Sequence, residues 1–120
     1  RSNWLNKEGP WNGEPDEVRE TQHGLEVQVL RNGIGALCGY VLLPKGHPWH
    51  GKDYEEIHAT VHGGLTYARP ENDAWKIGFD CAHWGDLAPA TGDGGTYRTM
   101  AYVRGECREL ARQAAEAAVS

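Results

Sequence analysis

Acid, imidazole and thiol side chains gather where an apolar segment ends, in the stretch WKIGFDCAHWGD at residues 75–86. Seven consecutive positions of this stretch include Asp80, Cys81, His83 and Asp86. Imidazole and carboxylate groups are common ligands of zinc and other divalent metals, and a bound metal lowers the pKa of a coordinated water. The stretch is therefore a candidate reaction centre, and the alternatives are a binding surface and a hydrogen-bonded turn.

A further imidazole, that of His62, lies in the segment ATVHGGLTYA, which we expect to form a strand interrupted by Gly63-Gly64. If this strand pairs with the one that ends at Asp80, His62 and Asp80 lie near each other across the sheet. We therefore expect His62, Asp80 and His83 to ligate a divalent metal such as zinc, with Asp86 holding an imidazole from behind. In catalysis, Asp80 and His83 would ligate or orient, and His62 would ligate or act as a base.

Two alternatives to this metal site stay open. The spacing D-x-x-H-x-x-D lacks the H-E-x-x-H helix of zinc proteases, and polar side chains at a strand end also form hydrogen-bond networks without a ligand. A thiolate–imidazole pair of Cys81 with His62 or His83 would supply a nucleophile. However, Phe79 and Cys81 share one face of a strand, which favours a buried and inert thiol.

The loop GHPWHG offers a second pair of imidazoles, His47 and His50. They would either clip a metal or belong to a rigid, proline-containing turn with Trp49 packed beneath it. Several aromatic residues lie near the same loops and would either wall a pocket for a planar or sugar-like ligand or pack in the core. These residues are Trp49, Tyr54, Tyr67, Trp84 and Tyr97.

Composition restricts the class of protein. The chain has 120 residues, of which 39% are hydrophobic and 24% charged, so we expect one soluble domain over residues 1–120. A net charge of −5 argues against binding to nucleic acid, and no apolar run approaches the roughly 20 residues of a membrane span. Three cysteines without a CxxC spacing predict reduced thiols and a cytoplasmic location. The chain begins with Arg1 and not with Met, so we expect a trimmed or processed form.

The pattern of apolar residues predicts the elements that must position these groups. Residues 1–15 show no periodicity, and we expect an irregular arm held down by its tryptophans. Alternation in LEVQVL predicts a half-buried strand, followed by a hairpin turn at Asn32-Gly33. The apolar run over residues 36–43 predicts a central strand, in which Gly39 marks a bulge or the close approach of another element.

The C-terminal segment changes period. Apolar residues recur at three- and four-residue steps, which predicts an amphipathic helix over residues 96–118 with Thr96 as its N-cap. This helix should cover one face of the sheet. The expected fold is therefore α+β, with a twisted antiparallel sheet of four or five strands and one long C-terminal helix packed on one face.

Four segments together resemble a family of small proteins encoded by bacteriophages and bacterial genomes. They are CGYVLLPKGHPWHG, VHGGLTYA, GFDCAHWGDLAP and GTYRTMAYVRGECRELA, and the resemblance covers about residues 30–113. Members of this family often have a longer link between LTYA and GFDCAH than the RPENDAWKI of this chain. The resemblance implies a bacteriophage setting, with the host cell cytoplasm as the location, and it implies no particular reaction.

The residues and the resemblance together leave three functional hypotheses. The first is a small phage-type hydrolase with a His/Asp site, assisted by a divalent metal, at the strand ends. The alternative is a non-catalytic phage accessory protein that binds a host protein or a small-molecule ligand, without nucleic acid or a membrane as partner. The third is a structural component of a virion.

Overall fold

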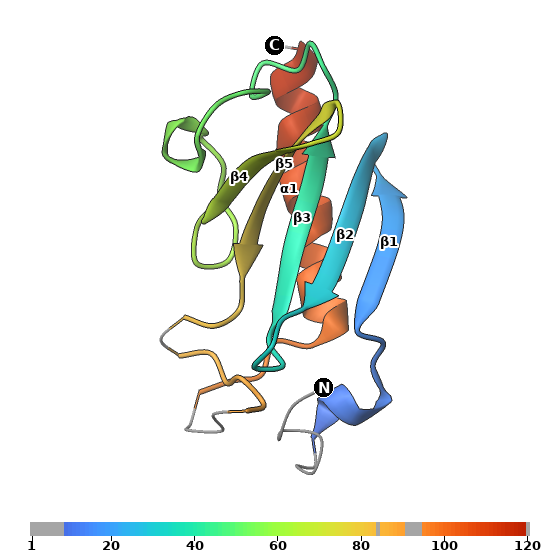
Figure 1. Ribbon diagram of the computed structural model, residues 1–120, viewed down its shortest axis with the longest axis vertical. Coiled ribbons are helices and arrows are strands. Elements are labelled where there is room, and N and C mark those ends of the chain that lie inside the picture. Colours follow the sequence, from blue (N-terminus) through green and yellow to red (C-terminus); the bar gives the residue numbers. More distant parts are fainter. Residues whose placement is uncertain (1–8, 84, 91–94, 120) are drawn as a thin grey trace.

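A computed structural model describes residues 9–83, 85–90 and 95–119 of the chain. Its centre is one antiparallel sheet with the strand order β1-β2-β3-β5-β4 (Figure 1). The strands are β1 (Glu17–Gln22), β2 (Leu25–Arg31), β3 (Leu37–Leu43), β4 (Tyr67–Glu71) and β5 (Ala74–Asp80). Among the described residues, no helix is both long and apolar enough to cross a membrane.

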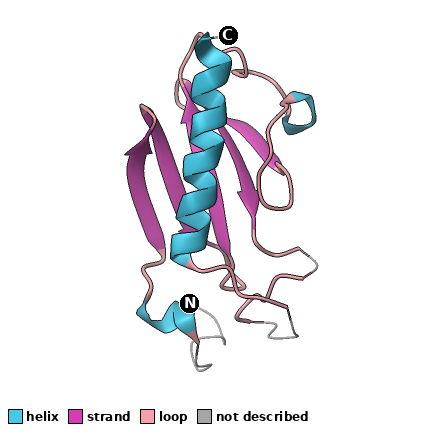
Figure 2. Ribbon diagram, turned by 180° about the vertical axis from the view of Figure 1, so that it is seen from behind, coloured by secondary structure: helices cyan, strands magenta, loops and turns pink. Residues whose placement is uncertain are grey.

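One long helix, α1 (Met100–Val119), lies across a single face of this sheet (Figure 2). The predicted α+β fold, with its antiparallel sheet and C-terminal helix, is therefore confirmed. The buried residues of the helix recur at three- and four-residue steps, as an amphipathic helix requires. They are Met100, Val103, Cys107, Leu110, Ala111 and Ala114.

The helix begins four residues later than residue 96, where the apolar pattern placed it. Its N-cap is Thr99, whose Oγ1 accepts a hydrogen bond from the Tyr102 N–H at 3.2 Å. Thr96 instead forms an isolated parallel bridge with Asp86, and its backbone N–H donates to the Gly85 carbonyl at 2.8 Å. Backbone pairing with the loop after β5 therefore removes Thr96 from the helix.

The core lies between α1 and the inward face of the sheet. Alternation along β2 turns Leu25, Val27 and Val29 inward, and all three are buried. At Gly39 of β3, a Cβ atom would lie 2.6 Å from both the Cys107 sulfur and the Phe79 ring. The predicted close approach at this glycine is therefore confirmed: the helix packs so near to β3 that no side chain fits between them.

The strand predicted over residues 59–68 is wrong for most of its length, because β4 begins only at Tyr67. Gly63 and Gly64 have φ angles of 70° and 80°, in the left-handed region that glycine adopts without strain. The Gly64 N–H donates to the Val61 carbonyl at 2.9 Å and closes a turn. His62 therefore lies in a turn that leads into the sheet, not on a strand.

The hairpin turn predicted at Asn32-Gly33 also differs in its geometry. The left-handed residue is Gly35, with φ of 88°, and Asn32 Oδ1 accepts hydrogen bonds from the N–H groups of Ile34 and Ala36 at 3.0 Å each. The turn with two successive positive φ angles joins β1 to β2 instead, at His23 and Gly24.

The described part of the N-terminal arm is fixed against the start of α1. It contains the short 3-10 helix η2 (Pro10–Gly13), and Trp11 packs edge-to-face on Tyr97 with ring centroids 5.1 Å apart. Glu14 accepts from the Met100 N–H at 2.7 Å and from the Tyr97 hydroxyl at 2.5 Å. Trp4, the other tryptophan of the arm, lies outside the described residues.

Two alanine substitutions test the packing of α1 on the sheet. Gly39→Ala should lower the free energy of unfolding by about 1–3 kcal/mol, because its Cβ would overlap the Cys107 sulfur and the Phe79 ring. Gly105→Ala is the matched control: its Cβ would meet no atom within 4 Å, and replacing a helical glycine stabilises by about 0.5–1 kcal/mol. Urea unfolding curves would measure both, and equal effects of the two variants would contradict this packing.

Candidate metal centre

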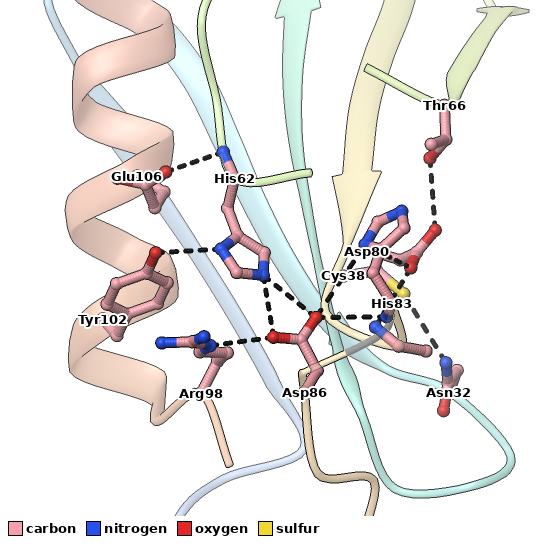
Figure 3. Close-up of polar contacts among 11 residues, drawn as sticks. Asn32, Cys38, His62, Thr66, Asp80, His83, Asp86, Arg98, Tyr102 and Glu106 are labelled. Atoms are coloured by element: carbon pink, nitrogen blue, oxygen red, sulfur yellow. Dashed lines mark hydrogen bonds and ion pairs between the residues drawn. The ribbon is translucent and has the colours of Figure 1, made fainter. Parts of the chain in front are cut away.

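Side chains from three segments converge below the end of β5 (Figure 3). The turn before β4 supplies His62, and the loop after β5 supplies His83 and Asp86. From the other side come Arg98, just before α1, and Tyr102 in the first turn of the helix. The cluster thus depends on α1 lying against the same end of the sheet as the two loops.

The carboxylate of Asp86 is the centre of this cluster, and its side chain is only 1% exposed. It accepts hydrogen bonds from Arg98 Nε at 2.8 Å, from His62 Nε2 at 2.9 Å and from the His83 backbone N–H at 3.1 Å. Burial by itself would raise the pKa of Asp86, but these three donors outweigh it and hold the pKa below its ordinary value. The carboxylate is therefore ionised and fully engaged.

His62 is held at both nitrogens of its ring. Because a carboxylate only accepts, His62 Nε2 carries a proton and donates it to Asp86. In the neutral ring, Nδ1 then accepts from the Tyr102 hydroxyl, at 2.9 Å. The backbone N–H of His62 donates to Glu106 of α1 at 2.8 Å, so the helix fixes both the backbone and the ring.

His83 stands opposite His62, with ring centroids 6.2 Å apart. Its Nδ1 atom lies 3.8 Å from Asp86 Oδ2 and 3.4 Å from Asp80 Oδ1. This nitrogen is shielded from solvent and has no hydrogen-bond partner among the described residues. A Cβ atom at Gly63 would lie 2.6 Å from the His83 ring, so the glycine after His62 is what lets the two histidines approach.

One ligand atom from each of His62, His83 and Asp86 lies within 4.8 Å of the other two. Within residues 9–83, 85–90 and 95–119, this is the one cluster of three or more His, Cys, Asp or Glu side chains with such spacing. Two imidazoles and one carboxylate match the three protein ligands of catalytic zinc sites, which keep a fourth position open for water or substrate.

Asp80, a predicted ligand, lies beside this group and not within it. Its Oδ2 accepts from the Thr66 hydroxyl at 3.2 Å, and its Oδ1 accepts from the Ala82 N–H at 3.1 Å. The expected approach of His62 to Asp80 across two paired strands does not occur, because the turn at Gly63-Gly64 ends the pairing at Tyr67. Asp86 occupies the place near His62 that the prediction gave to Asp80.

Sequence reasoning missed three residues on the helix side of the cluster. Arg98, Tyr102 and Glu106 follow one another at four-residue steps and contact Asp86 and His62. Residues four apart lie along one line of a helix, so this spacing could have indicated that the three side chains face the same neighbour. The line was not assigned a role because its polar residues also suit an exposed helix face.

The thiol and the second pair of imidazoles that the sequence singled out contact the core and the backbone. Cys81 is buried, as predicted, and burial raises the pKa of its thiol, which disfavours the thiolate. His47 Nε2 donates to the Ala114 carbonyl at 2.8 Å and its Nδ1 accepts from the Trp49 N–H at 2.9 Å. His50 Nε2 instead contacts the Asp73 carbonyl at 3.1 Å, so these two histidines bind backbone and form no clip.

A surface pocket of about 530 Å³ lies between β4 and the loop over residues 51–56, and Trp75 of β5 also lines it. Of the aromatic residues expected to wall a pocket, Tyr54 and Tyr67 line it, and Trp75 joins them. Trp49 is buried in the core, Tyr97 packs on the N-terminal arm, and Trp84 lies outside the described residues. Thr66 lines the pocket and donates to Asp80, so the pocket adjoins the cluster.

Comparison with models of protein families, with curated proteins and with solved structures finds no match for this chain. The resemblance to small phage-encoded proteins therefore stays a prediction. The functional argument rests on the geometry of the cluster and on the chemistry of its side chains.

Asp86→Asn tests the carboxylate at the centre of the cluster. In protein kept free of metal by a chelator, we expect a loss of about 2 kcal/mol in the free energy of unfolding at pH 7, because charge-assisted hydrogen bonds are lost. Folding lowers the pKa of Asp86, so its stabilisation is fully present above the ordinary carboxyl pKa of about 4 and is lost as the pH falls through the lowered value.

Urea unfolding of both proteins from pH 7 to pH 2 would measure this dependence. The difference between wild type and Asp86→Asn should be constant above about pH 5 and shrink at lower pH. Asp73→Asn is the control, since that side chain is 91% exposed and its loss should change stability by less than about 0.5 kcal/mol. A difference that persists undiminished at pH 2 would contradict the role of the charge.

Proposed function

We propose that this protein is a small hydrolase whose site uses a divalent metal such as zinc, held by His62, His83 and Asp86. The observation that carries the proposal is the convergence of one ligand atom from each residue to within 4.8 Å of the others. Metal–ligand bonds of about 2.0–2.2 Å hold two ligand atoms no more than about 4.4 Å apart, so binding would draw the three ligand atoms slightly closer together than the present limit of 4.8 Å. The shielded and unpartnered Nδ1 of His83 supports the proposal, because a metal would supply its missing contact.

The surroundings of the three ligands suit a metal. Coordination by His62 Nε2 would move the ring proton to Nδ1, which then donates to the Tyr102 hydroxyl at the present distance of 2.9 Å. Metal-bound histidines commonly donate their second ring N–H in this way. Arg98 bonds Asp86 Oδ1, whereas Oδ2 accepts from the His83 backbone N–H and from His62 Nε2. Coordination of His62 Nε2 would remove its hydrogen bond and give the metal that place on Oδ2.

Asp80 has the position of a general base. Its Oδ1 lies 3.4 Å from His83 Nδ1, the proposed ligand atom, and its carboxylate is held by Thr66 and Ala82. Asp80 would accept a proton from the water that attacks the substrate and would return it to the leaving group as the bond to that group breaks. A metal held by His62, His83 and Asp86 would lower the pKa of this water.

This assignment exchanges Asp80 for Asp86 among the ligands that the sequence predicted. Asp80 instead takes the role of base, which the sequence analysis gave to His62 as an alternative to ligation, and His62 and His83 remain ligands. The exchange is supported by burial, because the side chain of Asp86 is enclosed with the histidines whereas that of Asp80 is one third exposed. A base that delivers protons to a leaving group needs such access.

Binding without catalysis is the second candidate function, and the pocket along β4 favours it. Tyr54, Tyr67 and Trp75 would contact a planar small molecule or a side chain of a host protein. In that case the protein would act as a phage accessory protein in the host cytoplasm. Ligand binding that quenches tryptophan fluorescence, with no metal-dependent hydrolysis of ester substrates, would favour this candidate over the first.

Metal binding is the direct test of the first candidate. We expect elemental analysis of protein reconstituted with zinc or manganese to find one equivalent of metal per chain. Replacing His62, His83 or Asp86 by alanine should weaken binding by more than the 10–100-fold typical of losing an outer partner. His58→Ala, at an exposed histidine outside the cluster, should leave affinity unchanged. Full occupancy in the double variant His62→Ala/His83→Ala would overturn the site.

The hydroxyl of Tyr102 provides a finer test. Tyr102→Phe removes the hydrogen bond to His62 Nδ1 but keeps the ring beneath Arg98. We expect about tenfold weaker metal binding in competition titrations with a chromogenic chelator, since an outer partner of a ligand is lost. Tyr54→Phe in the β4 pocket is the matched control and should bind metal like the wild type. Equal affinities for wild type and Tyr102→Phe would show that His62 does not ligate through Nε2.

A further inference from the structure

Arg98 offers the cluster more than its bond to Asp86. Its Nε donates to Asp86 Oδ1 at 2.8 Å, and its Cζ lies 5.3 Å from the centroid of the Tyr102 ring. Among the described residues, its two terminal amino groups make no hydrogen bond, and the side chain is 28% exposed. A guanidinium that is anchored at one nitrogen and free at the other two is a positioned donor pair.

The guanidinium of Arg98 lies across the Asp86 carboxylate from the proposed metal position. Asp86 contacts Arg98 through Oδ1 and faces His83 through Oδ2, so one carboxylate separates the guanidinium from the metal (Figure 3). An anion with two oxygens on one central atom would fit this arrangement. One oxygen would bind the metal at its open position, and another would accept hydrogen bonds from Arg98.

The two cationic groups of the site would both contact an anion. In the metal-loaded site the metal would carry two positive charges and Arg98 one, and the carboxylates of Asp86, Asp80 and Glu106 lie around them. These charges balance, so selectivity for an anion would come from direct contacts with the two cations and not from an excess of charge. A neutral ester or amide would gain little from these contacts, whereas a phosphate ester carries its charge on oxygens that both cations can contact.

From this geometry we infer that the substrate class is a phosphate ester, with Arg98 as a residue that binds its phosphoryl oxygens. The inference rests on the proposed metal-assisted hydrolysis and names the group on which it acts. The metal-bound hydroxide would attack phosphorus as the bond from phosphorus to the leaving oxygen breaks. The products are the phosphate with one added hydroxyl and an alcohol that receives the proton held by Asp80.

Inorganic phosphate is a suitable probe, because it presents the same oxygens without turnover. Manganese-loaded protein would be titrated with phosphate while the relaxation of the phosphorus nucleus is followed by NMR, since a phosphorus bound near manganese relaxes much faster. We expect saturable enhancement for the wild type and at least tenfold weaker phosphate binding for Arg98→Gln at equal metal occupancy. Arg108→Gln is the matched control, at an exposed position of α1, and should bind phosphate like the wild type.

Arg98→Lys keeps a positive charge beside Asp86 and serves if the glutamine variant fails to fold. It should retain metal but bind phosphate about tenfold more weakly than the wild type, because the guanidinium fork is lost. Phosphate affinity that is unchanged in a folded, metal-loaded Arg98 variant would overturn the inference. So would phosphate binding without relaxation enhancement, which places the anion away from the metal.

An activity measurement distinguishes a role of Arg98 in binding phosphate from a role only in holding the structure. With manganese bound, the wild type should hydrolyse bis(p-nitrophenyl) phosphate, and Arg98→Gln should lose this activity far more than any hydrolysis of p-nitrophenyl acetate. Equal losses on both esters, or cleavage of the acetate alone, would overturn the phosphate assignment and leave the metal-assisted hydrolase standing. Failure of the protein to bind metal would instead overturn the proposed function itself.

Discussion

The buried carboxylate of Asp86 is the interaction on which this end of the molecule depends. An ionised carboxylate can stay in an enclosed place only if donors compensate for the lost water. Its three donors come from Arg98, from the His62 ring and from the backbone of His83, which belong to three separate segments. Satisfying one charge therefore brings together the turn before β4, the loop after β5 and the start of α1.

Much of the fold follows from local patterns in the sequence. The periodicity of α1 and the apolar run of β3 predict which faces of these elements are buried. Gly39 marks the place where the helix lies closest to β3. The errors arose where backbone geometry outweighed side-chain pattern. Gly63 and Gly64 turned an apolar segment into a turn, and the bridge between Asp86 and Thr96 delayed the start of the helix.

The candidate site was predictable in its residue types more than in its roles. His62, His83 and Asp86 could be named because the chain has only six histidines, and because these three residues lie near glycines at the ends of apolar segments. Their arrangement could not be predicted, because the alternation of side-chain directions ends with β5 at Asp80. Beyond this residue the direction of each side chain depends on contacts within the loop. Arg98 and Tyr102 escaped notice since their spacing is equally that of an ordinary helix.

The same contacts that hold the cluster without a metal would also adjust its affinity for one. Arg98 shares the charge of Asp86 and would weaken it as a ligand, and in the proposed reaction it would supply donors to an anionic substrate. The hydrogen bond from His62 to Asp86 must be exchanged for two metal bonds, which moderates affinity but fixes both ligands beforehand. The cluster would thus hold a metal less tightly than a purely structural zinc site, with Arg98 already positioned for the substrate.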